Sequence, residues 1–461
     1  MLILKYLVEL DWIPTVVTTR PDATPGMSTS HWSGMEIITI STNLGPFDRI
    51  RNMSRSKGGD VVEQRYEDET RADSPDLPTY ITYLVGKILG PLSALRGSSF
   101  PDKYGRYSSA MLNVIDYLHH IKRFEAVLSI STPFTAHTVA LPFTTKTRLP
   151  WIAAVKDYFS FPRDMKPNDL NGFVNSLKRR YERSVLKESD ILLPHCSDIA
   201  SHLHELLPNA VYRIITNCYD QRDFIGQLET DHNCHDRFTI VFAGSMYDYD
   251  HGMFFEAIQE LYSTGLISPE SFIVRFVGAE KDKVQAEVER YSCKHLVQVV
   301  DKLPYDEAIN EIKQATCLLY RQKPGCFPRR TSEFIATRRP ILAFPAYENT
   351  WSQSVLRAYG AAIIAANKEE IKTTLVNWHR EFWATDKLSL PVNEDLVQSF
   401  SARHQAKEFN EVLEEAISQH RQRSGKKMTT AAHSARVGLM IADHRGHLDI
   451  ESRHEASLPF S

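Results

Sequence analysis

The feature that most constrains the fold is a regular alternation of short apolar runs, rich in Val, Ile and Phe, with helix-length segments. Such alternation is typical of βαβ units, in which helices cover both faces of a parallel sheet. The predicted strands of the first half are 15–18, 36–40, 126–131, 151–155, 191–194 and 213–216. Those of the second half are 238–243, 272–277, 297–300, 317–320, 341–344 and 361–364. The sequence therefore predicts an α/β protein with two Rossmann-like, doubly wound domains that face a central cleft.

A polar stretch at 227–237 separates the two series and gives the predicted domain boundary. The predicted units are a first domain (1–226), a second domain (237–398), a final helix (399–420) and a tail (421–461). The segment at about 45–105 breaks the alternation of the first domain and is predicted to be an insertion. The tail mixes His, Ser, Arg and Gly without periodicity, so we expect it to be disordered.

Charge and cysteine usage exclude several classes of protein. The 461 residues include 54 Lys and Arg against 57 Asp and Glu, a formal net charge of -3 that provides no global basic field for nucleic acid. The six cysteines form no C-x-x-C pair, which indicates a reduced, cytoplasmic chain. No stretch of about 18 apolar residues is present, so any membrane contact is expected to be peripheral. The basic segment 178–187 is either a solvated face or a contact for anionic lipid at the inner membrane.

Glycines follow two strands of the second series. Gly244 and Ser245 end the strand 238–243, and Gly278 ends the next strand. A glycine in this position lets a ligand phosphate approach backbone amides near a helix N-terminus. The alternative is a tight βα turn without a ligand.

A second candidate is the segment 328–336, in which a proline precedes a helix with Arg330 and Glu333 near its start. The carboxylate could complement the helix dipole, or it could accept both hydroxyls of a ribose. Arg330 could hold a phosphate or carboxylate through two hydrogen bonds. The spacing alone leaves these interpretations open.

The segment 328–343 resembles the "iPsKlfEYlaaGrPIL" block of glycosyltransferase family 4-like enzymes. Other stretches match that family in the same order, at 5–7, 12–18, 100–102, 128–137, 149–153, 156–157 and 215–220. The resemblance covers roughly residues 1–417. It implies the two-domain GT-B fold and transfer of a sugar from a nucleotide diphosphate donor to a glycan or lipid-linked acceptor, as in polysaccharide biosynthesis. It also implies retention of configuration, no metal and no cofactor beyond the nucleotide sugar as co-substrate.

The resemblance also assigns residues. The donor would contact Gly244, Ser245, Arg330 and Glu333 on the second domain, with His251 at the position of the usual lysine. Gly278 joins this set because it repeats the strand-and-glycine arrangement one strand later. The acceptor and the reacting centre would face Lys156, Asp157 and His137, with Thr132 and Phe134 on the same side. A departing diphosphate needs positive groups and amides where charge develops, which is the chemical reason for such a set.

The sequence departs from the family at several positions. The loop 246–251 contains Asp248 and Asp250 where relatives carry cations, with His251 at the position of the usual lysine. The two aspartates also match a metal-binding D-x-D, although a solvated loop is the preferred interpretation. The first acidic residue of the family's E-x7-E pattern falls on Gly325. The chain begins inside the first helix of the family, so the first strand is expected to be missing. An inactive GT-B-like binding protein and a sugar-nucleotide epimerase are therefore the alternative functions.

Overall fold

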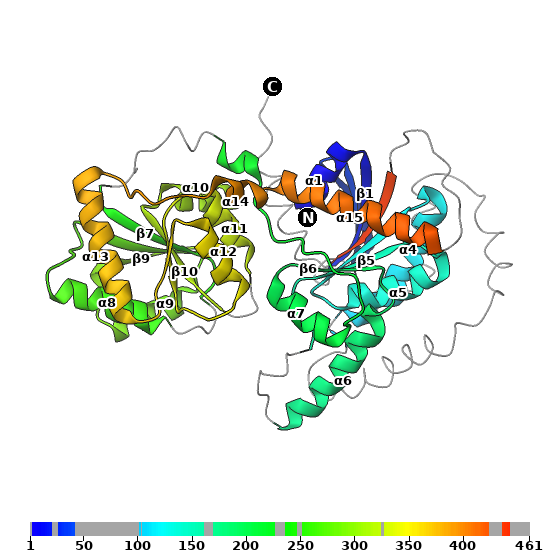
Figure 1. The fold of residues 1–461 in the computed structure, drawn as a ribbon, viewed down its shortest axis with the longest axis horizontal. Coiled ribbons are helices and arrows are strands. Elements are labelled where there is room, and N and C mark those ends of the chain that lie inside the picture. The colour runs from blue at the N-terminus through cyan, green and yellow to red at the C-terminus, as the bar shows by residue number, and fades with distance from the viewer. Residues whose placement is uncertain are drawn as a thin grey trace.

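The computed structural model contains two α/β domains, each built around its own sheet (Figure 1). It describes residues 2–20, 26–41, 101–102, 104–160, 169–225, 236–246, 251–323, 327–423 and 436–442. The predicted insertion at about 45–105 and the boundary at 227–237 lie largely outside the described residues. Within the described part of the chain, no helix has both the length and the apolar character needed to cross a bilayer.

The first domain has a seven-stranded sheet in the order β2-β3-β1-β13-β4-β5-β6. Its strands are β1 (Trp12–Arg20), β2 (Gly26–Trp32), β3 (Met35–Ser41), β4 (Ala126–Ser131), β5 (Trp151–Val155), β6 (Ile191–Pro194) and β13 (Arg436–Ile441). Neighbouring strands are parallel, except that β2 pairs antiparallel with β3. The predicted strand at 213–216 is absent, because those residues form the segment that leads out of the domain.

β13 is the unexpected element, because it comes from the segment expected to be a disordered tail. It pairs in parallel with β1 on one side and with β4 on the other. Leu439, Met440 and Ile441 are at most 2% exposed. The prediction of disorder is therefore wrong for residues 436–441, because their alternate side chains enter the cores on both faces of the sheet.

β13 also changes the expectation that the first strand of this domain is missing. The common doubly wound sheet has the strand order 3-2-1-4-5-6. Here β3, β1, β13, β4, β5 and β6 occupy these six positions in turn, so β13 stands at position 1. The sheet position is filled, and it is filled by residues that follow the second domain in sequence.

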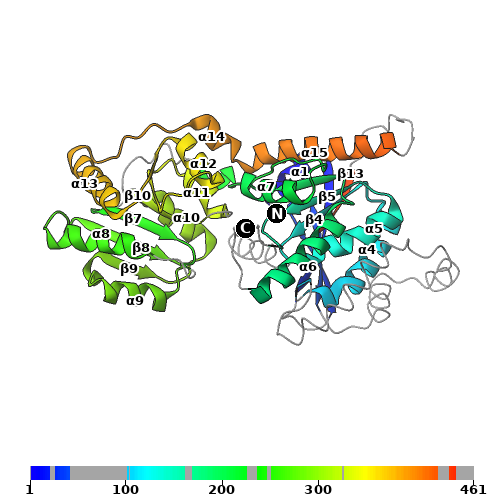
Figure 2. The ribbon, with the colours of Figure 1, turned by 60° about the horizontal axis from the view of Figure 1, so that its bottom comes forward.

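Helices cover both faces of this sheet. They are α1 (Leu2–Leu7), α4 (Ser108–Lys122), α5 (Thr135–Thr147), α6 (Asp169–Leu186), α7 (Ser197–Leu206) and α15 (Ala402–Arg423). One core joins Val17, Val127 and Leu439 to α4, α5, α6 and α7. The other joins Val16 and Met440 to α1 and α15. Where a final helix was predicted at 399–420, the structure has α15 at 402–423, which lies along the first domain beside α1 (Figures 1 and 2).

The second domain has a six-stranded, fully parallel sheet in the order β12-β11-β10-β7-β8-β9. Its strands are β7 (Phe238–Ala243), β8 (Phe272–Val277), β9 (Val297–Val300), β10 (Cys317–Arg321), β11 (Ile341–Phe344) and β12 (Ala362–Ile364). Its helices are α8 (Gly252–Ser263), α9 (Lys281–Arg290), α10 (Tyr305–Gln314), α11 (Arg329–Ala336), α12 (Trp351–Tyr359), α13 (Lys368–Thr385) and α14 (Glu394–Ser399). The six predicted strands of this half are confirmed to within one residue at each end.

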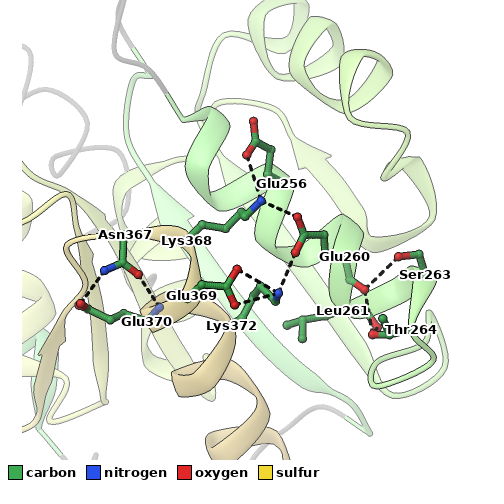
Figure 3. Close-up of polar contacts among 10 residues, drawn as sticks. All are labelled: Glu256, Glu260, Leu261, Ser263, Thr264, Asn367, Lys368, Glu369, Glu370 and Lys372. Atoms are coloured by element: carbon green, nitrogen blue, oxygen red, sulfur yellow. Dashed lines mark hydrogen bonds and ion pairs between the residues drawn. The ribbon is translucent and has the colours of Figure 1, made fainter.

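An ion-pair network joins α8 to α13 on the second domain (Figure 3). Glu260 accepts from Lys368 and Lys372, and Lys372 also pairs with Glu369 at 3.0 Å. Asn367 caps α13 by accepting from the backbone amide of Glu370 at 3.0 Å. The hydrogen bonds from the two lysines lower the pKa of Glu260. Because these groups lie at the surface, we expect the network to contribute little to the free energy of unfolding.

Truncation of Leu439 tests the central place of β13. Leu439→Ala should lower the free energy of unfolding by about 2–5 kcal/mol, because three buried side-chain carbons are lost from a packed core. Val437→Ala, at the half-buried start of the same strand, is the matched control and should cost less. Urea unfolding gives both values. Equal costs, together with coil-like hydrogen exchange at residues 439–441, would contradict the position of β13.

Candidate active site

Glu333 lies in the second turn of α11, at the carboxyl edge of the second sheet, and is 2% exposed. Its Oε1 is 3.0 Å from Arg329 Nε, and its Oε2 is 2.7 Å from Arg330 Nη1. These spacings of four and three residues place both guanidinium groups on the helix face of Glu333. The predicted pair of Arg330 and Glu333 is therefore together, with Arg329 as an added partner, and the carboxylate lies beneath the two cations.

Tyr305, which sequence reasoning missed, connects this carboxylate to the segment between the domains. Its hydroxyl lies 3.1 Å from Glu333 Oε1 and 2.9 Å from Asp223 Oδ2. The hydroxyl carries one proton, so the two carboxylates share it. The guanidinium carbon of Arg329 lies 5.0 Å from the centre of the Tyr305 ring. The sequence signal that could have identified Tyr305 is its position, because it is the first residue of α10, the helix that follows β9.

Opposing effects act on the acidity of Glu333. Burial alone would raise its pKa, but the charges of Arg330 and Arg329 and the hydrogen bonds from Tyr305 and Arg329 bring the pKa below its ordinary value. The carboxylate therefore stays ionised at neutral pH. A buried anion held by two cations and a phenol can accept hydrogen bonds from ligand hydroxyls once a cation moves aside.

The first domain brings Asp157 and Thr132 together at the ends of β5 and β4. Thr132 Oγ1 donates to Asp157 Oδ2 at 2.7 Å, and Asp157 is exposed. The backbone amide of Lys156 donates to the carbonyl of Ser131 at 3.2 Å, which extends the pairing of the two strands to this point. Lys156 and Asp157 thus lie at the sheet edge where open α/β sheets bind ligands.

The edges of the two domains meet near His195, which follows β6 and was not predicted as a site residue. Its ring lies against the carbonyl of Phe327, the second residue before α11. Burial, helped by the charge of Lys156, lowers the pKa of His195 to about 4. Asn217 Nδ2 also donates to the Phe327 carbonyl, at 2.7 Å. These contacts attach the start of α11 to the first domain.

Cys218 is buried in the segment that leads out of the first domain. Burial raises the pKa of its thiol to about 11, and positive charges, including those of Lys156 and Arg329, act in the opposite direction. A second inter-domain contact is made by Asp198 Oδ1 on α7, which accepts from the Trp351 amide at the start of α12 at 2.9 Å.

The turn after β7 holds a carboxylate that the sequence did not point to. Ser245 Oγ donates to Glu280 Oε1, and the Met246 amide donates to Glu280 Oε2 at 2.8 Å. Gly244 and Gly278 have positive φ angles of 124° and 71°, as their glycine identity suggests. Their amides donate to the carbonyls of Val277 and Val300, so both are used by the sheet.

Two histidines that were predicted as site residues, His137 and His251, are buried and pack in the interior of the structure. His137 is fully buried, its Nδ1 lies 2.7 Å from Ser129 Oγ, and its ring packs edge-on against Phe134. Burial lowers its pKa to about 3, so the imidazole is neutral. This placement contradicts the prediction that His137 is catalytic, because its ring is enclosed by the buried side chains of Phe134 and Trp151, which do not open to solvent. His251 is 1% exposed and packs against Phe242, so it does not present a cation to a diphosphate.

The metal alternative concerns residues that the structure does not describe. Asp248 and Asp250 fall in 247–250, and Gly325 in 324–326, both outside the described ranges. Among the described residues, no group of three or more His, Cys, Asp or Glu side chains is arranged to hold a metal ion.

No family model and no curated protein matches this sequence. The structure is similar to an α,α-trehalose-phosphate synthase (UDP-forming) from Burkholderia xenovorans in complex with glucose-6-phosphate, at 7% identity, TM-score 0.55, and coverage of 87% of this chain and 100% of that one. It is also similar to a sucrose-phosphate synthase from Thermosynechococcus elongatus, at 12% identity and a TM-score of 0.51, with 92% of this chain and 91% of that one covered. A glycosyltransferase from Rickettsia africae ESF-5 is similar at 13% identity and a TM-score of 0.51, with 88% of this chain and 99% of that one covered. At these identities the likeness establishes the fold, and the predicted GT-B architecture is confirmed.

The low pKa of Glu333 predicts a pH-dependent contribution to stability. A carboxylate with a folded pKa below its unfolded value stabilises the folded chain above about pH 4.3, and this contribution is lost as the pH falls through the folded pKa. The stability difference between the wild type and Glu333→Gln should therefore be largest at neutral pH and shrink in acid. Urea unfolding at pH 7, 5 and 3.5 measures it. A difference that is independent of pH would show that the ion pairs contribute nothing.

Proposed function

We propose that this protein is a glycosyltransferase that moves a sugar from a nucleoside diphosphate donor to a hydroxyl acceptor. The observation that carries the proposal is the buried Glu333 carboxylate beneath Arg329 and Arg330, at the carboxyl edge of the second sheet. The fold supports it, because one structure with this fold is named as a UDP-forming synthase in complex with a sugar phosphate.

The donor is assigned to the second domain. Glu333 would accept hydrogen bonds from the ribose hydroxyls, and Arg330 would turn from the carboxylate toward the diphosphate. Both guanidinium side chains are about a quarter exposed, at 27% and 26%, so they can reach a ligand and uncover Glu333 as they turn toward it. As the bond from the sugar to the diphosphate breaks, negative charge grows on the phosphate oxygens. Arg329, Arg330 and Lys156 would stabilise this charge in the transition state.

The acceptor is assigned to the first domain, where Asp157 is exposed beside Thr132. Asp157 would accept a hydrogen bond from the attacking hydroxyl and would take up its proton as the new glycosidic bond forms. A glycan or lipid-linked acceptor, retention of configuration and independence from metal remain parts of the proposal, and so does a cytoplasmic place with peripheral membrane contact. The basic face of α6 that would make this contact is partly neutralised, since Arg179 pairs with Glu205 at 3.9 Å.

Donor binding provides the first test. A panel of nucleoside diphosphates and their sugars should raise the melting temperature of the protein with at least one base, because a ligand of the folded state stabilises it. Glu333→Ala should weaken that binding at least about tenfold, or about 1.4 kcal/mol. Glu307→Ala removes an exposed carboxylate of α10 and is the control. Unchanged affinity in Glu333→Ala would count against the donor site.

Turnover provides the second test. Asp157→Asn should lower the rate of sugar transfer by about 100-fold, a typical loss for a group that handles a proton, and should leave donor affinity unchanged. The measurement is release of nucleoside diphosphate with and without acceptor. Conversion of the donor without acceptor would favour the epimerase alternative, and binding without turnover under any acceptor would favour the inactive binding protein.

A further inference from the structure

Glu280 connects the two glycine-containing turns of the second domain. It directly precedes α9, whereas Ser245 and Met246 follow β7, the strand next to β8 in the sheet. One carboxylate oxygen accepts from the Ser245 hydroxyl and the other from the Met246 amide, at 2.8 Å. A backbone amide and a hydroxyl at such a turn are donors that suit an anionic oxygen. The turn is therefore an anion site that holds the protein's own carboxylate.

The surroundings of the turn leave room for a larger anion. A Cβ atom built on Gly244 meets no atom of the described residues within 4 Å, so those residues leave space beside this backbone. Glu280 is only partly buried, and Lys283 lies one turn further along α9 with an exposed side chain. The charge of Lys283 already contributes to the low pKa of Glu280, after the larger effect of the Ser245 hydrogen bond. A displaced Glu280 carboxylate thus has a cation within reach on its own helix.

We propose that Glu280 is an internal competitor for the donor diphosphate, and that its departure from Ser245 and Met246 is what allows phosphate oxygens to bind at this turn. This inference rests on the proposed function, because it assigns a residue that sets affinity at the same site. Two anions cannot share one amide and one hydroxyl, and a phosphate beside an ionised carboxylate is repelled. Glu280 therefore lowers the affinity for the charged part of the donor and leaves affinity for the nucleoside unaffected.

The experiment compares binding of UDP, ADP and GDP, of their nucleosides and of inorganic pyrophosphate to the full chain by calorimetry. Glu280→Gln keeps the size and the hydrogen-bonding oxygen of the side chain but removes its charge. It should bind the preferred nucleoside diphosphate about three- to tenfold more tightly than the wild type, since a like charge beside the ligand is removed. The affinity for the matching nucleoside should not change. Glu289→Gln, at an exposed position of the same helix, is the matched control and should behave as the wild type.

The outcomes separate this inference from the proposed function. If Glu280→Gln binds nucleoside diphosphates equally or more weakly while Glu333→Ala abolishes binding, the inference is wrong and the donor site stands. If neither the wild type nor Glu280→Gln binds any nucleotide or nucleotide sugar, both fail together. Should Glu280→Gln not fold, Glu280→Asp keeps the charge but shortens the side chain by one methylene, so the carboxylate cannot reach both donors. It should give a smaller gain in the same direction, and a loss would overturn the inference.

Discussion

A central strand of a buried parallel sheet must have hydrogen-bonding partners on both sides, because an unpaired backbone amide or carbonyl in the core is costly. In the first domain this constraint is met by β13, which lies between β1 and β4. The strand follows α15, and α15 packs with α1 on the same face of the sheet. The two ends of the described chain thus build the middle of one domain, and the edge that carries Thr132 and Asp157 depends on that assembly.

The candidate active site depends on contacts between the second domain and the first domain with its connecting segment. α11 begins where Phe327 is held by His195 and Asn217 of the first domain and the connecting segment. Glu333 is in turn tied through Tyr305 to Asp223 of that segment. The carboxylate is therefore positioned by contacts from both domains. A change in the relative position of the domains would alter its partners, which is how binding on one domain could be transmitted to the other.

Both predicted anion-binding features of the second domain are satisfied internally in the structure. Arg329 and Arg330 are paired with Glu333, and the turn after Gly244 is paired with Glu280. Such pairing keeps charged groups compensated without a ligand, and it means that a ligand binds by exchanging partners. The charge balance of the site, more than its shape, is then the main determinant of which anion it accepts.

The sequence by itself determined the alternation of strands and helices, the two domains and the adjacency of Arg330 and Glu333, because these follow from periodicity and from spacing along one helix. It did not show that 436–441 is a central strand, since a short run of Val, Gly, Leu, Met and Ile after Arg436 in a polar tail has no local signature of its partner. It also misplaced His137, whose burial depends on Phe134 and Ser129 from a neighbouring strand and turn. The roles of Tyr305, His195 and Glu280 arise from elements far apart in sequence. Only the tertiary structure decides such contacts, because burial and charge pairing belong to neighbours in space.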